Sequence, residues 1–455
     1  MRGGGIGIAI AGFGLVASDV FVFKTHLLAL TIGLRHMLQV LQGYYRTQLK
    51  KKDIISSLRR THTTVNMPRA LTVQKIEGAK PGKVYYPYVY HPLLSLLSFL
   101  FPRKLPANIF HSLQLTEVPT PTPSPTQLLI RIQAAALNHR DLFIRQHLYP
   151  GISFTHPLLA DGYGTVISAG SSTSLPIGSN VLLYPAHGWE SDPLGPEAGD
   201  KFSVVGGAAL VPWGAGQEVV CVEESEVVLA PEHLTPAEGA ALPLVGVTGW
   251  RALVTKTGEG KEGRNILITG IGGGVALQTM QFAVAMGCNV FVTSGDEEKI
   301  ERAKKLGARG GVVYKEAGWE KRLKEMLPAD RPWLDAVVDG AGGEVVGKTV
   351  RLLKAGGVIA QYGMTVGPKM DWVMQAVLKN VELKGSTMGS KKEFREMVEF
   401  VREKKIRPVV SRTVKGIDNL EGIDGLFEDM KAGRQFGKLV IEFEGGDSRS
   451  SSPKL

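Results

Sequence analysis

Residues 265–308, NILITGIGGGVALQTMQFAVAMGCNVFVTSGDEEKIERAKKLGA, decide the fold, because they predict a strand, a glycine-rich turn, a helix, a second strand and a second helix. The run 265–269 is short and apolar, which is typical of a strand buried on both faces of a sheet. Residues 275–286 carry apolar side chains at helical spacing, and Gly287 ends the pattern. This order predicts a βαβ unit with parallel strands and a right-handed crossover.

The glycines between the first strand and the helix predict a dinucleotide-binding site. Glycine allows left-handed backbone and has no Cβ to obstruct a phosphate. The following helix directs its free N–H groups and the positive end of its dipole at whatever lies over the turn, usually a pyrophosphate. Many glycine-rich turns bind nothing, but this one lies between a strand and a helix and is followed by a second strand, as a dinucleotide site requires. The expected cofactor-binding residues of this turn are Gly270, Gly272, Gly273, Gly274 and Val275.

The end of the second strand indicates which dinucleotide is bound. An NAD site usually has Asp or Glu there, which accepts hydrogen bonds from the ribose 2′-hydroxyl. Here Ser294 and Gly295 follow the strand, and the acids at 296–298 come later, where carboxylates are expected at a helix N-terminus. Ser294 with Lys299 suits a 2′-phosphate, so we expect NADPH rather than NADH. The alternative is that Lys299 is only a solvated charge on the helix.

Composition places the chain among α/β enzymes. Its 455 residues predict two to three domains, and 55 glycines with 44% hydrophobic residues argue against a disordered or fibrous protein. Cys221 and Cys288 are the only cysteines and lie far apart in the sequence, which excludes a disulfide framework. Free thiols suit a reducing compartment, so we expect a cytoplasmic protein.

The positive charge is concentrated at the start of the chain. Residues 1–66 hold nine Lys or Arg and two Asp, so they carry +7 of the net charge of +10 and leave +3 for the rest. The high isoelectric point therefore does not predict nucleic-acid binding by the body of the chain. We expect the segment 1–66 to be an extension that the fold does not need or a mitochondrial transit sequence, in preference to the alternative of a membrane anchor. Membrane contact is expected only through this segment, and a mitochondrial location only if it acts as a transit sequence.

Six segments occur in the order typical of one enzyme superfamily. They are AALNHRDLFIRQHLYPG, LPLVGVTGWRAL, ILITGIGGGVALQ, LDAVVDGAGGE, LLKAGGVIAQYG and QFGKLVIEF. From residue 67 to about residue 443 the chain resembles the medium-chain dehydrogenase/reductase superfamily, in its zinc-free quinone-oxidoreductase-like branch, also described as zinc-type alcohol dehydrogenase-like. A departure is Ala276, where the glycine string usually ends in Gly.

The resemblance implies an α/β fold with a GroES-like, β-barrel-type catalytic domain and a Rossmann doubly wound parallel sheet. It also implies a small-molecule substrate in the cleft between the two domains, and a homodimer. The implied boundaries are an extension at 1–66, the catalytic domain at 67–245 with an insertion at 88–112, the NADP-binding Rossmann domain at 246–384, the C-terminal part of the catalytic domain at 385–444, and a disordered tail at 445–455.

Zinc is not expected in this chain. By the resemblance, the zinc-dependent relatives have a ligand Cys where this chain has Asn138 and a ligand His where it has Ala160, and they hold a structural zinc with four closely spaced Cys. No Cys lies between Asn138 and Trp213. Without a Lewis acid to polarise an alkoxide, reversible alcohol oxidation is not expected.

The resemblance also implies roles for further residues. The nicotinamide is expected beside Thr248 and the backbone of Ala341, Gly342, Gly363 and Met364, with Phe436 and Lys438 closing over the cofactor. Asn138 donates an N–H to a substrate oxygen or only fixes the loop backbone. Tyr149 and Tyr163 are candidate proton donors or stacking surfaces, although a buried Tyr more often only packs its ring.

The function expected from these features is hydride transfer from NADPH to an electrophilic acceptor, either a quinone or an α,β-unsaturated carbonyl compound. One alternative is a zinc-type alcohol dehydrogenase. Another is a non-catalytic, NADPH-binding scaffold attached to a membrane by residues 1–66.

Overall fold

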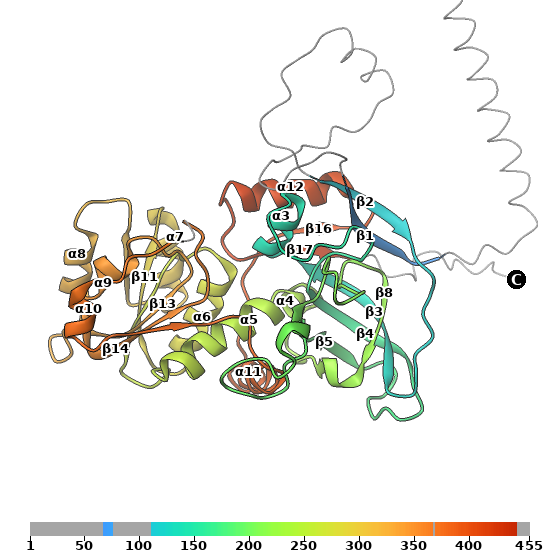
Figure 1. Ribbon diagram of the computed structural model, residues 1–455, viewed down its shortest axis with the longest axis horizontal. Helices are drawn as coiled ribbons and strands as arrows, with labels where there is room; N and C mark the ends of the chain where they lie inside the picture. Colours follow the sequence, from blue (N-terminus) through green and yellow to red (C-terminus); the bar gives the residue numbers. More distant parts are fainter. Residues whose placement is uncertain (1–66, 76–110, 367–368, 444–455) are drawn as a thin grey trace, which may run out of the picture. The chain divides into compact units, whose positions relative to one another are not determined.

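The computed structural model describes residues 67–75, 111–366 and 369–443 (Figure 1). The expectations for residues 1–66 and 445–455, and for nearly all of the insertion at 88–112, lie outside these ranges. Within the described ranges no helix is both long enough and apolar enough to cross a bilayer.

A parallel sheet of six strands contains the stretch that predicted the fold. Its order is β12-β11-β10-β13-β14-β15, so the order reverses beside β10 and β13. In such sheets ligands bind outside the carboxyl ends of the strands at this switch point. The strands are β10 (Asn265–Ile268), β11 (Asn289–Ser294), β12 (Gly310–Val313), β13 (Leu334–Asp339), β14 (Leu353–Gln361) and β15 (Glu382–Gly385).

Both faces of this sheet are buried, as the apolar run 265–269 predicted. Ile266 and Ile268 of β10 belong to one buried cluster, whereas Leu267 between them belongs to another. The helix predicted after the glycine turn is α6, which packs on β10 and β11. The helices of this part are α6 (Gly274–Ala285), α7 (Glu297–Lys305), α8 (Trp319–Met326), α9 (Val345–Thr349) and α10 (Met374–Leu378). These observations confirm a Rossmann sheet.

A second sheet, mostly antiparallel, is built from both ends of the described chain. Its order is β16-β17-β3-β4-β5-β9, with β8 also paired to β3. The long strand β3 lies between β17 and β4, so residues from the C-terminal part complete the sheet of the N-terminal part. The strands are β3 (Gln127–Ala136), β4 (Asp161–Ala169), β5 (Asn180–Leu183), β8 (Val219–Glu223), β9 (Val227–Leu229), β16 (Val410–Lys415) and β17 (Lys438–Glu442).

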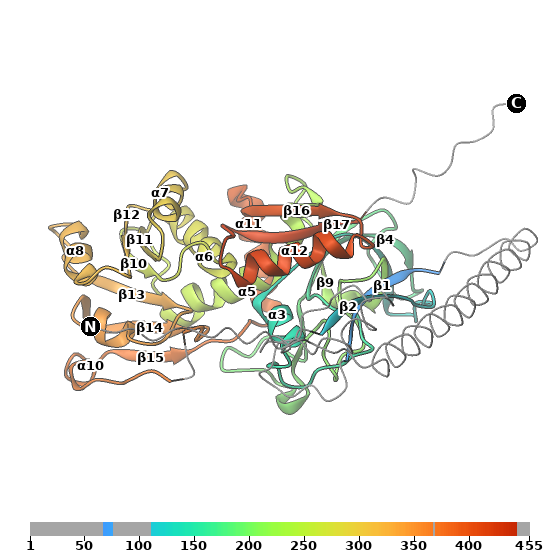
Figure 2. The same ribbon diagram turned by 90° about the horizontal axis from the view of Figure 1, so that it is seen from above.

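Helices connect the two sheets and cover the second one. Figure 2 shows α12 lying along β16 and β17, and the same pairs are in contact. Helix α5 packs against both α6 and α11. The helices are α3 (His139–Arg145), α4 (Pro236–Ala240), α5 (Pro243–Trp250) with its π-helical continuation η3 (Arg251–Thr257), α11 (Lys391–Lys404) and α12 (Leu420–Lys431). Two short strand pairs complete the fold: β1 (Arg69–Gln74) with β2 (Ser112–Glu117), and β6 (Ala186–His187) with β7 (Ser203–Val204).

A single carboxylate organises the loop between β6 and β7. Glu197 accepts backbone hydrogen bonds from Glu190 at 2.8 Å and from Ser191 and Asp192 at 2.7 Å each. These bonds lower the pKa of Glu197 to about 2, and the bond from Ser191 has the largest effect. Lys391 at the start of α11 attaches the loop to the rest of the chain, because its backbone N–H donates to the Trp189 carbonyl at 3.0 Å.

We predict that Glu197→Gln loosens this loop. The amide keeps one acceptor oxygen and replaces the other with a donor, so amide hydrogen exchange of Glu190, Ser191 and Asp192 is expected to accelerate. In the parent protein the folded-state pKa lies below the ordinary value of 4.5. The protection of these three amides, corrected for intrinsic exchange, is therefore complete at pH values above the ordinary pKa of 4.5 and is lost as the pH falls through about 2. Glu301→Gln, an exposed substitution on α7, is the control; equal protection in both variants would contradict this role.

Candidate active site

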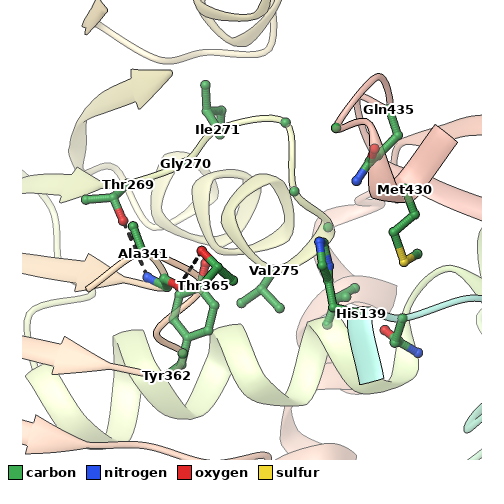
Figure 3. A pocket seen from close by; sticks show the side chains of 18 of the residues that line it. His139, Thr269, Gly270, Ile271, Val275, Ala341, Tyr362, Thr365, Met430 and Gln435 are labelled. Carbon is green, nitrogen blue, oxygen red and sulfur yellow. Dashed lines mark hydrogen bonds between the residues drawn. The ribbon is translucent and has the colours of Figure 1, made fainter. Parts of the chain in front are cut away.

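A cavity of about 1070 Å³ lies where the carboxyl ends of the Rossmann strands meet the second sheet. Figure 3 looks into it, with Thr269, Ala341 and Tyr362 on one side and His139 and Gln435 on the other. Residues of the glycine turn, of the tip of β11 and of α3 all line this one cavity. Its size and its position at the switch point suit a dinucleotide with a small acceptor beside it.

The glycine turn forms one wall of the cavity and requires glycine for physical reasons. Gly270 and Gly272 have φ values of 68° and 119°, where other residues are strained. A Cβ on Gly274 would lie 2.9 Å from both the Lys438 and Val245 side chains. Gly273 is the N-cap of α6, so the first N–H groups of that helix have no preceding helical carbonyl to bind. These free donors fit a pyrophosphate.

Thr269 and Asp339 hold the neighbouring loop in place. Asp339 ends β13, is fully buried, and accepts hydrogen bonds from the Thr269 hydroxyl and from the backbone N–H groups of Ala341 at 3.2 Å and Gly342 at 2.7 Å. Tyr362 covers the same loop, because a Cβ on Gly340 would lie 2.5 Å from its ring. The backbone expected beside the nicotinamide is thus fixed by a buried carboxylate.

Lysines flank the tip of β11. The Lys299 ammonium donates to the Gly433 carbonyl at 2.6 Å, and burial lowers the pKa of Lys299. Tyr314 and Lys315 lie over Gly295, where a Cβ would meet the tyrosine hydroxyl at 2.8 Å and the lysine Nζ at 3.2 Å. The acids in this region, Asp296, Glu297 and Glu316, also line the cavity, but one carboxylate oxygen of Asp296 caps α7 through the N–H of Glu298.

The opposite end of the cavity is organised around a buried ammonium group. Lys438 Nζ donates to the Leu137 carbonyl, to Asn138 Oδ1 and to Asp161 Oδ2, each at 2.7 Å, which uses all three of its hydrogens. Asn138 Nδ2 donates to the same Asp161 oxygen at 2.9 Å. The other Asp161 oxygen accepts from the N–H of Leu244 at 2.7 Å. The Asn138 side chain is therefore held by Lys438 and Asp161, and its second amide hydrogen makes no bond to the residues that the structure describes.

The residues at the two former ligand positions do not fit a catalytic zinc. The Asn138 amide is bonded to Lys438 and Asp161, and the Lys438 ammonium already supplies a positive charge there. Ala160 packs with Val205 and Val211 in an apolar cluster. No group of three or more His, Cys, Asp or Glu side chains that could hold a metal occurs among the residues that the structure describes.

Helix α3 supplies further groups to this end of the cavity. Arg140 and Phe143 of this helix line the cavity, as does Tyr149 in the loop after it, and the Arg140 guanidinium lies 4.8 Å from the centre of the Tyr149 ring. His139 also lines the cavity. Partial burial, and to a lesser extent the positive charge of Lys438, lowers the pKa of His139, so the imidazole is neutral near pH 7. Burial raises the pKa of Asp141 in the wall behind to about 6.

Most of the residues expected from the sequence lie around this one cavity. They are Asn138, Tyr149, Thr248, Gly270, Gly272, Gly273, Gly274, Val275, Ser294, Lys299, Ala341, Gly363, Met364 and Lys438. The position of Lys438 differs from the expectation, however, because its ammonium binds protein groups and is not free to close over a cofactor.

Three expected residues do not line the cavity. Tyr163 packs its ring against Gly239 in the core, which does not suit a proton donor, and burial raises the pKa of its hydroxyl. Phe436 is buried beneath the Arg302 guanidinium, 4.0 Å from its ring, and so does not close over the cavity. Gly342 contributes its N–H to Asp339 and does not line the cavity.

Sequence reasoning missed several residues that build the site. Asp161 and Asp339 carried a usable signal, because Asp161 begins β4, Asp339 ends β13, and each adjoins apolar residues, where an unpaired charge would be costly. Tyr314 and Lys315 could have been found as the residues after the third strand of the parallel sheet, next to the tip of the second. No sequence signal distinguishes Arg140 and His139 from ordinary polar residues of a short helix.

Comparisons with known proteins agree with this architecture. The family model described as "Alcohol dehydrogenase GroES-like domain" matches residues 124–232, and the model described as "Zinc-binding dehydrogenase" matches residues 274–403. The first match covers most of the second sheet, which confirms the expected GroES-like domain. The second match begins in the glycine turn.

Individual relatives match over nearly their whole length. A zinc-type alcohol dehydrogenase-like protein, YogA, of Leptosphaeria maculans is 54% identical over 383 residues, covering 83% of this chain and 100% of the relative. An acryloyl-coenzyme A reductase of Sulfurisphaera tokodaii is 28% identical, covering 72% of this chain and 96% of the relative. A solved NAD-dependent alcohol dehydrogenase is 29% identical with a TM-score of 0.64, covering 72% of this chain and 95% of that structure.

We predict that Lys438→Met lowers the free energy of unfolding by about 3–5 kcal/mol, because it leaves the Asp161 carboxylate buried without its counter-ion. Chemical denaturation measures this change. The double variant Lys438→Met/Asp161→Asn is expected to lose less unfolding free energy than the sum of the losses in the two single variants, because it leaves no unpaired buried charge. Lys415→Met, at an exposed position of β16, is the matched control. Additive effects would show that the two groups do not interact.

Proposed function

The chain belongs to the medium-chain dehydrogenase/reductase superfamily and is therefore an oxidoreductase, and we propose that it is a zinc-independent, NADPH-dependent reductase of quinones or α,β-unsaturated carbonyl compounds. Members of this superfamily use nicotinamide cofactors. The glycine turn and the backbone of Ala341 and Gly363 would hold a nicotinamide dinucleotide, which in its reduced form would supply a hydride to the electron-poor acceptor, while solvent would supply the proton that completes the two-electron reduction.

The observation that carries the proposal is the Lys438 ammonium bound to Asn138 and Asp161. A zinc ion at this position would need several protein ligands and would lie beside a positive charge. Reductions of activated double bonds do not need a metal, because charge that develops on the acceptor oxygen is stabilised by hydrogen-bond donors. The remaining N–H of Asn138 is a candidate donor for this oxygen.

The proposed preference for NADPH rests on the lysines around the tip of β11. Ser294 stands where NAD-binding relatives of this fold usually have an acid. Its hydroxyl donates to the Ile271 carbonyl at 3.4 Å and accepts from the Asp296 N–H at 3.2 Å, so it shapes the tip of the strand. Lys299 and Lys315 supply the positive charge that a 2′-phosphate requires, and Lys315 is an addition to the residues expected from sequence.

A zinc-type alcohol dehydrogenase is the second candidate, because the relative with 54% identity is described as zinc-type alcohol dehydrogenase-like. A non-catalytic NADPH-binding scaffold is the third. The three candidates make different predictions about metal content and turnover, so one set of measurements distinguishes them.

We expect the purified full-length chain to oxidise NADPH in the presence of quinones or enones. The rate is expected to be unchanged after treatment with a chelator, and elemental analysis is expected to find less than one zinc per chain. Loss of activity on chelation with recovery on adding zinc would favour the alcohol dehydrogenase. Tight NADPH binding without turnover of any acceptor would favour the scaffold.

We also predict that Lys299→Ala and Lys315→Ala each weaken NADPH binding by about 10-fold, because each removes a charged donor to the phosphate. The dissociation constant of NADH, which lacks the phosphate, is expected to change less than about 2-fold. Fluorescence titration measures both constants. Lys305→Ala, an exposed position on the same helix α7, is the control. Equal losses for NADPH and NADH would place the lysines away from the 2′-phosphate.

A further inference from the structure

Arg140 has two hydrogen-bonding nitrogens without a partner at the acceptor end of the cavity. The side chain is only 7% exposed, yet Nε and Nη2 are buried and bind nothing in the part of the chain that the structure describes. A buried donor without a partner costs free energy, and such groups in a cavity wall often serve a ligand. Arg140 lines the same cavity as the glycine turn and Asn138.

The third nitrogen holds the guanidinium in a fixed orientation. Nη1 donates to the Val205 carbonyl at 2.8 Å and to the Gly206 carbonyl at 2.7 Å. Nε and Nη2 form one edge of the planar group, and this edge binds a carboxylate through two parallel hydrogen bonds. The protein thus fixes the orientation of the Arg140 guanidinium through Nη1, and the edge formed by Nε and Nη2 can bind a ligand.

The acids near Arg140 leave one edge of its guanidinium without a partner. The nearest acid is Asp141, whose Oδ1 is 3.5 Å from Nη1. Its other oxygen accepts from the Asn138 N–H at 2.7 Å. Asp161 is already paired with Lys438. Among the described residues neither carboxylate therefore bonds to Nε or Nη2, and this edge is available to a carboxylate from outside the chain.

The surroundings of Arg140 also suit an organic acid. Phe143, Val204 and Leu244 line the cavity near it and offer apolar surface to a carbon skeleton. The Tyr149 ring lies against the guanidinium at 4.8 Å, so a ligand that reaches Nε and Nη2 displaces part of this cover.

We propose that Arg140 binds a carboxylate of the acceptor through Nε and Nη2, so that the preferred acceptor is an α,β-unsaturated carbonyl compound that carries a carboxylate. This substrate class rests on the proposed reductase function. A carboxylate that cannot be reduced can bind without turnover, so the proposed carboxylate site and the proposed reductase function can fail separately.

The test compares an acid with its ester on the full-length protein saturated with NADP⁺. The binding probes are 4-oxopentanoate and its methyl ester, which lack the reducible double bond, measured by calorimetry. The parent protein is expected to bind the acid at least about 10-fold more tightly than the ester. Arg140→Gln is expected to abolish this preference, and Arg140→Lys to retain only part of it, because lysine keeps the charge but has no planar fork. Arg131→Gln, an exposed arginine on β3, is the charge-matched control.

Folding and cofactor binding are checked in the same variants by thermal unfolding and NADPH titration. Equal affinity of the parent protein for acid and ester would overturn the proposal. A variant that folds, keeps the acid preference and loses NADPH affinity would assign Arg140 to the cofactor and would also overturn it. Tyr149→Ala, which removes the ring and keeps the guanidinium, is expected to bind the acid more tightly than the ester, as the parent protein does. If this variant loses the preference for the acid, the Tyr149 ring selects the acid and the proposal is overturned.

Turnover gives the last comparison, between 4-oxo-2-pentenoate and its methyl ester with NADPH. A higher kcat/KM for the acid that falls at least about 10-fold in Arg140→Gln, with the ester little changed, supports the proposal. If neither these compounds nor any quinone or other enone is reduced but the acid is bound selectively, the proposed reductase function fails and the carboxylate site stands.

Discussion

The interaction on which the site depends is the buried ion pair between Lys438 and Asp161. It joins the first residue of β17 to the first residue of β4, 277 positions earlier in the chain. A buried carboxylate or ammonium alone would be very unfavourable, so the C-terminal strand is held against the N-terminal part of the sheet. The same ammonium binds Asn138 and thereby fixes the start of α3. One pairing thus supports the sheet, the helix that carries Arg140, and the wall of the cavity.

The two ends of the cavity are built in different ways. At the glycine turn the groups that can contact a ligand are mainly backbone N–H donors, and their placement requires residues without a Cβ. Around α3 the available groups are side chains, oriented by buried partners such as the carbonyls that hold Arg140. A backbone site suits a cofactor shared by many enzymes, whereas side chains can differ between related chains and can select an acceptor. The C-terminal segment touches both ends, because the Gly437 N–H donates to the Gly272 carbonyl at 3.0 Å and Lys438 follows it.

Local signals predicted the Rossmann part well and the roles of individual side chains less well. Apolar runs, glycines and helical periodicity identified β10, α6 and β11, because these features depend on neighbours in the sequence. The same signals could not separate a buried side chain that faces the cavity from one that faces the core. Tyr149 and Tyr163 were equal candidates, and the structure places the first in the cavity and the second against Gly239. For Phe436 the difference again lies in packing, because it is buried beneath Arg302.

The sequence by itself determined the parallel sheet and the glycine turn between its first strand and the following helix, and both follow from spacing, chirality and the chemistry of single residues. The significance of Asn138 and Ala160 came from the resemblance to the superfamily. Only the tertiary structure decided that Lys438 pairs with Asp161, that Tyr314 and Lys315 join Lys299 at the tip of β11, and that two donors of Arg140 find no partner within residues 67–75, 111–366 and 369–443. These are contacts between residues far apart in the chain, or absences of such contacts, and their geometry depends on how the two sheets pack together.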